Sequence, residues 1–408
     1  MTTFHQHGDG PAASRALRLA SFDPAAFDRP SGREEEWRFT PVTQLGSLFE
    51  PSDLVPDAAV TVEQAGGATC ALVPKDHPSV GTTPAPGDRV AAAAWQAAEQ
   101  AFLVTFDGAG QAGPAGEVGE ADRTGVTWLT ARGGAAGQEA APSAGLIVIE
   151  AKPGARGTVV IDHVGQAYRA GTMEIVLGEG ADLTVVTLHQ WAPDAVHVTS
   201  HRARLAKDAH LKHVTISTGG ALVRVTPHVA LEGPGANLEL LGLNLTDTGQ
   251  HHEAQLFVDH AAPNCTSRAT YKGALLGEGA HSVWIGDVLI RGAAHGTDTY
   301  ELNRNLVLAK GAHADSVPNL EIETGNIRGA GHASATGRFD DEQLFYLQAR
   351  GIPEVEARSL VVHAFFNDLI GRIGRPEIEA RLTGLVDQKL AAVMARLGLS
   401  LGPGGGAA

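Results

Sequence analysis

Short apolar runs separated by turn residues dominate the chain from about residue 146 to residue 337. Examples are Leu146–Ile149, Leu183–Leu188, Leu238–Leu245 and Val283–Ile290. Runs of this length, bounded by Gly, Pro, Asp and Asn, are typical of β-strands. This stretch is therefore predicted to be mainly β.

Small residues recur in the turns that precede these strands. Alanines stand at 155, 181, 209, 236, 280 and 312, in steps of 26, 28, 27, 44 and 32. Steps in the range of about 20 to 50 residues indicate stacked repeats, and a parallel β-helix stacks one coil on the next around a ladder of inward residues. We predict a right-handed parallel β-helix over 146–337. A β-sandwich stays open as the alternative, although the Asn-Gly and Asp-Gly pairs that favour hairpins are scarce.

The pattern differs on both sides of this core. Residues 1–145 are interpreted as an N-terminal α-rich region with a flexible linker, in which Asp88 caps a helix that runs on through Trp95 and Phe102, and the stretch 31–41 contains a helix start. Residues 338–400 predict a C-terminal helical domain of three helices, bounded by Gly351, Pro353 and Pro376. These helices would cover the end of the solenoid or form a docking module, and residues 401–408 predict a disordered tail.

Composition and charge exclude several classes of function. The formal net charge of −15 argues against nucleic acid and against an anionic membrane surface, because both need a basic face. No run of about 18 apolar residues predicts a membrane span, and the first residues do not read as a signal peptide. We expect a cytoplasmic protein that binds neither nucleic acid nor membrane.

Few residues point to chemistry. With only Cys70 and Cys265, the chain alone supplies no four-thiolate cluster site and no disulfide framework, and both thiols are interpreted as structural. No motif of an ATP-hydrolysing P-loop, a zinc protease or a serine hydrolase occurs. The sequence His251-His252-Glu253 is interpreted as a polar turn, and Asp259-His260 as a hydrogen-bonded pair. His332, among small residues between the last strands and the first C-terminal helix, is a candidate metal ligand, with a structural role as the alternative.

The segment around His332 resembles the SufB/SufD family of the SUF iron–sulfur assembly system. The similar blocks are His332–Gly337, Leu344–Leu347 and Ala349–Ile352, with Asn303–Leu306 and Pro318–Ile322 upstream. The segment Glu36–Pro41 is similar to one in the SufD members of that family. SufB members would carry a cysteine just before the histidine, whereas Gly329-Ala330-Gly331 stands here. The chain also has Ala-Ser-Ala-Thr after the histidine, where the family has Gly-Ala-Thr.

This resemblance implies a non-enzymatic scaffold subunit. It implies a heterodimer with a SufB-like subunit through the β-helices, a homodimer in isolation, and docking of a SufC-like ABC ATPase on the C-terminal helices. His332 would bind a transient iron–sulfur cluster or iron shared with the partner subunit, and the chain itself would bind no nucleotide. The residues expected to bind partners are Phe345, Tyr346, Leu347, Arg350, Gly351, Leu360 and Phe365. The alternative from fold class alone is a β-helix polysaccharide lyase or hydrolase.

Overall fold

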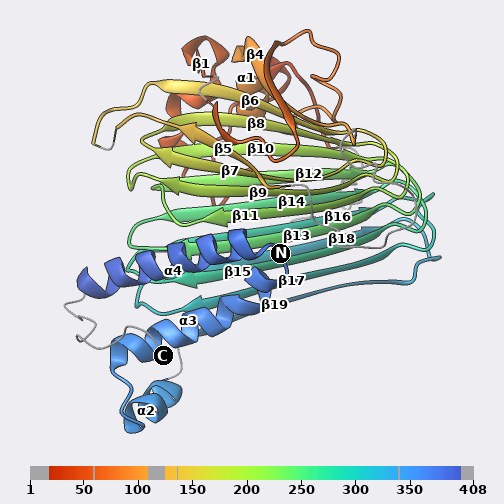
Figure 1. Cartoon of the computed structure of the whole chain (residues 1–408). Coiled ribbons are helices and arrows are strands. Elements are labelled where there is room, and N and C mark those ends of the chain that lie inside the picture. Colours follow the sequence, from red (N-terminus) through yellow and green to blue (C-terminus); the bar gives the residue numbers. More distant parts are fainter. Residues whose placement is uncertain (1–17, 58–59, 109–124, 136, 339–340, 397–408) are drawn as a thin grey trace, which may run out of the picture.

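The computed structural model describes residues 18–57, 60–108, 125–135, 137–338 and 341–396 (Figure 1). The expected tail 401–408 lies outside the described residues, as does much of the expected linker before residue 146. From residue 100 onward, successive strands alternate between two sheets, which we call sheet A and sheet B. One strand from each sheet, with its turns, makes one rung of a solenoid.

Sheet A has the strand order β18-β16-β14-β12-β10-β8-β6-β4-β3, with β1 paired to β6. Its strands are β1 Val55–Pro56, β3 Thr69–Pro74, β4 Gln100–Phe106, β6 Pro142–Ala151, β8 Tyr168–Leu177, β10 Val196–Leu205, β12 Leu222–Leu231, β14 His251–His260, β16 His281–Ile290 and β18 His313–Ile322.

Sheet B has the order β19-β17-β15-β13-β11-β9-β7-β5-β2. Its strands are β2 Val60–Gln64, β5 Thr127–Arg132, β7 Arg156–Gly165, β9 Asp182–Trp191, β11 His210–Ser217, β13 Asn237–Thr246, β15 Thr266–Leu275, β17 Asp298–Val307 and β19 Gly329–Arg338.

Neighbouring strands along the solenoid pair in parallel and in unbroken register, as β8 with β10 and β15 with β17 do. This pairing confirms the predicted parallel β-solenoid and excludes the β-sandwich, whose hairpin-linked strands would be antiparallel. The strands read as continuous apolar runs because both of their faces are buried over much of the molecule. One face lies against the other sheet, and the other face lies under the N-terminal region or the C-terminal helices.

The recurring alanines lie at two different edges of the solenoid. Ala155, Ala181, Ala209 and Ala236 are fully buried just before strands of sheet B. Ala280 and Ala312 instead precede strands of sheet A, which accounts for the irregular step of 44. On the sheet B edge the series continues at Cys265, which directly precedes β15 and is also fully buried.

The N-terminal region contains less helix than expected. Its described part has one α-helix, α1 (Arg89–Ala97), the 3₁₀ turns η2 (Pro24–Ala26), η3 (Val42–Gln44), η4 (Gly46–Phe49) and η5 (Pro51–Asp53), and the strands β1–β5. Since β4 and β5 pair in parallel with β6 and β7, solenoid strands begin before residue 146. Residues 31–41 form only turns, although the backbone N–H of Ser31 donates to Glu34 Oε1 at 3.0 Å.

Asp88 caps α1 as predicted, because its Oδ1 accepts a hydrogen bond from the N–H of Ala91 at 2.8 Å. The helix does not run on to Phe102, and that extension is wrong. Ala98 already has extended backbone angles, and Phe102 lies in β4 opposite Ile147 of β6. Parallel pairing buries this apolar run more completely than one helical face could.

The three C-terminal helices begin where predicted, and the first ends before Gly351 as expected: α2 Asp341–Ala349, α3 Glu354–Gly371 and α4 Pro376–Arg396. Helices α3 and α4 lie along the outer face of sheet B rather than over the end of the solenoid (Figure 1). Their buried residues include Val362, Phe366, Leu369, Ile370, Ile373, Ile378, Leu382, Val386, Leu390 and Val393. Burial of such side chains stabilises by about 1.5–3 kcal/mol each, so these two helices form one unit with the solenoid. Helix α2 projects from it.

Candidate functional site

The C-terminal end of the solenoid leaves its last two strands open. In the described part of the chain β18 pairs only with β16, and β19 only with β17. The burial changes accordingly: alternate residues of β17 are buried, those of β18 are half-buried, and most of β19 is exposed. Unpaired backbone N–H and C=O groups on such edges are ready to pair with another chain.

His332 lies in the middle of this open end. In the β17–β19 register it stands opposite Glu301, and side chains on a strand alternate between its two faces. His332 therefore shares the inward face with Thr299, Glu301 and Asn303, which are buried. It is exposed all the same, since no further strand of the described chain covers it. An inward-facing but accessible imidazole is available to a ligand brought by a partner.

The interior near His332 is polar, whereas the earlier rungs enclose large apolar side chains together with a group of histidines. Asn303 Oδ1 accepts hydrogen bonds from Ser316 Oγ at 2.6 Å and from Asn305 Nδ2 at 2.8 Å. Asn305 Nδ2 also lies 3.4 Å from Thr336 Oγ1. These contacts join β17, β18 and β19, so the polar side chains hold the terminal rungs in place.

Glu301 has the most strongly shifted pKa among the acidic residues of this region. Its side chain is buried, and neither carboxyl oxygen has a hydrogen-bond partner among the described residues. Burial, with a smaller contribution from the carboxylate of Asp287, raises the pKa of Glu301 to about 8. A neutral carboxyl group one rung below His332 is a proton donor at neutral pH. Sequence reasoning missed it, although the alternation Thr299-Glu301-Asn303-Asn305 marks a polar strand face.

Neither cysteine belongs to this site. Cys265 fills the ladder position before β15, and its thiol lies 3.3 Å from the carbonyl oxygen of Gly233. Cys70 on β3 is half-buried. Burial raises the pKa of both thiols, so both are poor nucleophiles and ligands at neutral pH. Both positions suit the structural role predicted for them.

The structure contradicts the predictions for two segments that contain histidine. The polar-turn interpretation of His251-His252-Glu253 is wrong, because all three residues are buried in β14. His251 and Glu253 face outward, whereas His252 faces inward and lies 3.2 Å from Thr246 Oγ1. Strands β12 and β16 pair with β14 on its two sides, so this segment is an extended strand rather than a turn.

The prediction that Asp259 and His260 form a hydrogen-bonded pair is also wrong. Asp259 accepts two hydrogen bonds from the guanidinium of Arg291, at 2.7 and 2.8 Å. His260 points to the other face and lies 2.9 Å from Ser267 Oγ. Adjacent strand residues face opposite ways, which separates the two side chains.

A group of inward histidines was not anticipated. His163, His189 and His197 pack together with ring centroids 4.8 to 5.2 Å apart, and His201 lies 2.9 Å from His213. Burial lowers the pKa of His163 to about 4, and it also lowers the pKa values of His189, His197 and His201 well below the usual value. These rings are neutral parts of the core.

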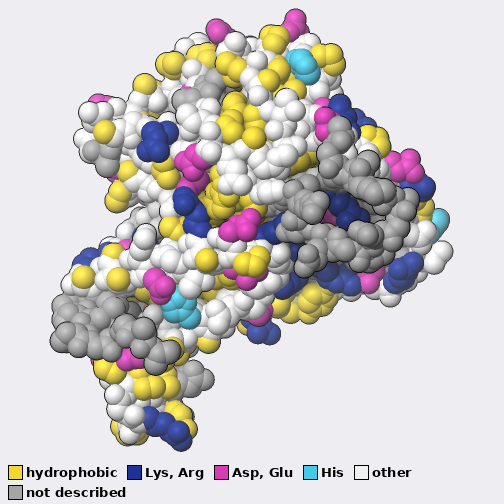
Figure 2. Space-filling model, in the orientation of Figure 1, with side chains coloured by type: hydrophobic (Ala, Val, Ile, Leu, Met, Phe, Trp, Pro, Cys, Tyr) yellow, Lys and Arg dark blue, Asp and Glu magenta, His cyan; other side chains and the backbone are white. Residues whose placement is uncertain are grey.

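The residues expected to bind partners fall into two groups. Phe345 and Tyr346 on α2 are 72% and 55% exposed, and Leu360 on α3 is 47% exposed. Figure 2 shows hydrophobic side chains beside Lys or Arg on the projecting lobe that contains α2. Arg350 lies over the Tyr346 ring at 4.7 Å, Leu347 is half-buried, and Gly351 ends the turn after α2 with a positive φ of 85°.

Phe365 forms the second group, because it makes its contacts within the chain. It packs partly against the cluster under α3 and α4. Lys272 on β15 donates from Nζ to the Phe365 carbonyl oxygen at 2.6 Å, and its ammonium group lies 5.0 Å from the ring centroid. Phe365 thus fixes α3 to sheet B.

Comparison with known proteins defines the class. The family model described as "SUF system FeS cluster assembly, SufBD core domain" matches residues 134–365. The chain is 46% identical over 389 residues to an iron–sulfur cluster assembly SufBD family protein of Mycobacterium tuberculosis, covering 94% of each chain. The chain belongs to the SufBD family of SUF-system iron–sulfur cluster assembly proteins.

More distant relatives carry both subunit names. The chain is 26% identical over 244 residues to the iron–sulfur cluster assembly protein SufD of Escherichia coli, which covers 52% of this chain and 57% of that protein. It is 28% identical over 203 residues to SufB of Bacillus subtilis, covering 50% of this chain and 43% of that one. In the described part of the chain, every helix is too short or too polar to cross a membrane.

Proposed function

We propose that this chain is a SufD-type scaffold subunit of a SUF complex, with a SufB-type subunit and a SufC-type ABC ATPase as its partners. The iron–sulfur cluster is the cargo of such a complex and is shared between its subunits. Family membership supports a role in iron–sulfur cluster assembly, and it favours a scaffold over the alternative of a polysaccharide lyase or hydrolase. A cytoplasmic location remains a prediction.

The observation that carries this proposal is the setting of His332. It is an accessible imidazole on the inward face of the last strand, at an end where two strand edges have no pairing strand among the described residues. An imidazole is a good iron ligand, but a cluster also needs thiolates. β17, β18 and β19 contain no cysteine, so the thiolates must come from the subunit that pairs with this end. This is the division of labour expected of a SufD-type chain beside a SufB-type one.

The open edges supply the means of pairing. A partner strand added to β18 or β19 would satisfy their free N–H and C=O groups, and on β18 it would cover Ile322, which is 44% exposed. The same contact would enclose His332 and exclude water from the shared site. A second copy of this chain could use the same edges when the SufB-type partner is absent.

Helix α2 is the proposed docking element for the ATPase subunit. Phe345 and Tyr346 are large aromatic side chains on a projecting helix, and aromatic anchors of this kind often dominate binding energy. We expect replacement of both by Ala to weaken capture of the SufC-type ATPase by at least about tenfold. The stability of the chain should not change, because neither side chain is buried. Leu19→Ala, an equally exposed change on the N-terminal segment, is the matched control.

Co-expression with the SufB-type and SufC-type proteins of the same cell tests the proposal as a whole. A stable complex that contains all three chains is the expected result, and light scattering gives its mass. If this chain is recovered as a monomer under conditions in which the other two assemble, the proposal is wrong.

A further inference from the structure

The outer face of sheet A carries a row of histidines at the start of its last three strands. His251, His281 and His313 are the first residues of β14, β16 and β18 and are direct neighbours in the register. The rings of His251 and His281 are 4.7 Å apart edge to face, and those of His281 and His313 are stacked at 4.0 Å. Two residues further along the same outer face stand Glu253 on β14 and Asp315 on β18.

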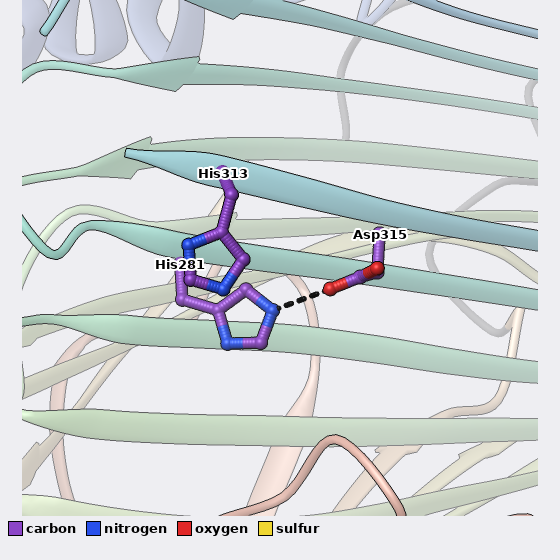
Figure 3. Close-up of side chains that lie close together, drawn as sticks. All are labelled: His281, His313 and Asp315. Atoms are coloured by element: carbon purple, nitrogen blue, oxygen red, sulfur yellow. Dashed lines mark hydrogen bonds and ion pairs between the residues drawn. The ribbon is translucent and has the colours of Figure 1, made fainter. Parts of the chain in front are cut away.

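These groups form a chain of short polar contacts. His251 Nε2 lies 3.0 Å from Glu253 Oε2, and His251 Nδ1 lies 3.1 Å from His281 Nδ1. His281 Nε2 lies 2.8 Å from Asp315 Oδ2, the contact drawn in Figure 3. Each of the three contacts needs one hydrogen between its two heavy atoms, but two neutral imidazoles carry only two N–H groups. Either a third proton, on an imidazole or a carboxyl group, or a metal ion is needed to complete the chain.

A metal ion at the Asp315 end completes it without a third proton. If His281 binds the ion through Nε2, its Nδ1–H donates to His251 Nδ1, and His251 Nε2–H donates to Glu253. Every contact is then satisfied with both imidazoles neutral. A ligand histidine whose other nitrogen donates to a further acceptor, with a carboxylate behind it, is the usual surrounding of a protein-bound metal. Glu253 is held for this role by Arg224, whose Nε donates to Glu253 Oε1 at 3.0 Å.

The Asp315 end also has the ligands for an ion. One atom each from His281, His313 and Asp315 lies within 4.8 Å of the other two, and Figure 3 shows the His313 ring beside His281 with Asp315 beyond it. In a tetrahedral site with metal–ligand bonds of about 2.0–2.2 Å, ligand atoms are roughly 3.3–3.6 Å apart. Small side-chain rotations therefore suffice. His313 is exposed, and the side chains of His281 and Asp315 are 16% and 36% exposed, so an ion can enter.

We propose that His281, His313 and Asp315 bind a divalent first-row transition-metal ion on the outer face of sheet A, with His251 and Glu253 as the residues that position His281. Two imidazoles and one carboxylate suit Zn²⁺ and Fe²⁺, whereas Mg²⁺ and Ca²⁺ prefer oxygen ligands alone. Water fills the remaining coordination positions. The site is distinct from His332, which faces inward on the opposite sheet, and it goes beyond the proposed assembly function.

The test is metal binding by the full chain. His5 and His7 near the N-terminus are replaced by Ala in every sample to remove their background. Zn²⁺ binding is measured by calorimetry, and Co²⁺ binding by its visible absorption, in the presence of excess Mg²⁺. We expect one Zn²⁺ per chain and a Co²⁺ spectrum of nitrogen and oxygen ligands.

Four variants decide the assignment. His313→Ala and Asp315→Asn should each weaken Zn²⁺ binding by at least about tenfold, and His251→Gln should weaken it by about tenfold through loss of the positioning contact. His295→Ala, an exposed histidine in the turn before β17, should bind as the reference does. Circular dichroism confirms that the surface variants are folded. Absence of stoichiometric binding, or equal affinity in the reference, His313→Ala and Asp315→Asn, would overturn the proposal.

Discussion

The two ends of the solenoid are finished in different ways. At the N-terminal end each sheet gains one antiparallel strand, β3 on β4 and β2 on β5, and the inward residues of β4 and β5, such as Val104 and Leu129, are fully buried. At the C-terminal end no strand of the described chain follows β18 or β19, and the inward residues become polar. The chain closes one end with its own strands, whereas the described residues leave the other end open. The predictions below test this difference, from the largest expected effect to the smallest.

Apolar side chains should contribute more in the middle of the solenoid than at its open end. Ile175 on β8 is fully buried in the inner core, whereas Leu320 on β18 is only partly buried against it. Ile175→Ala should lower the free energy of unfolding by about 2–5 kcal/mol through transfer and cavity terms. Leu320→Ala should cost about 1 kcal/mol or less in the isolated chain. Urea denaturation measures both, and equal losses would contradict an open C-terminal end.

The buried histidines should make the middle of the solenoid sensitive to acid. Burial lowers the pKa of His163 to about 4, below its unfolded value of about 6.5. The unfolded chain therefore binds a proton that the folded chain excludes, and stability falls as pH drops from about 6.5 to 4. The contribution of His163 is about 1.4 kcal/mol per pH unit, about 3 kcal/mol in total.

His163→Gln keeps a donor for the Leu188 carbonyl, which His163 Nδ1 contacts at 3.3 Å, but it cannot be protonated. The measured quantity is the slope of the unfolding free energy against pH, rather than its absolute value. The slope between pH 4 and 6.5 should be smaller in the variant by about 1.4 kcal/mol per unit. Equal slopes would mean that the ring is not excluded from protonation.

Glu301, at the open end, should give the unfolding free energy the opposite dependence on pH. Its folded pKa of about 8 lies above the unfolded value, so the folded chain holds a proton that the unfolded chain releases. Stability should fall as pH rises from about 4.5 to 8, by at most about 1.4 kcal/mol per unit. Contact with water at the open end should make the measured effect smaller. Glu301→Gln should remove this loss, and the difference from the unmodified chain should grow with pH. A difference that stays constant between pH 5 and 8 would show that Glu301 is ionised.

The sequence predicted the architecture well because periodicity reports it directly. Apolar runs marked the strands, the recurring alanines marked the turns, and prolines with one glycine marked the three C-terminal helices. The helix extension to Phe102 failed because one apolar run satisfies helical and strand spacing alike, and only the partner strand β6 decides between them.

The site was predicted less completely. The resemblance at His332–Gly337 singled out His332. The alternation around Glu301 marks a polar strand face but not its burial, and the histidine row could not be predicted from the pattern. Alternation shows that His251 and His252 point to opposite faces, but not which face is the interior. In this fold the outer faces are buried as well, so the apolar pattern does not separate them. The contact between His281 and Asp315 depends on the register of β16 with β18, and the register comes only from the structure.

The most direct test of the central claim is cluster formation by the assembled complex with His332→Ala in this chain. We expect the variant complex to keep its subunits and its mass but to lose most of the iron and sulfide that the unmodified complex acquires, because one ligand of the shared site is missing. His295→Ala, carried through the same preparation, should load normally. Unchanged iron and sulfide content in the His332→Ala complex would contradict a role for the open end of this solenoid in holding the cluster.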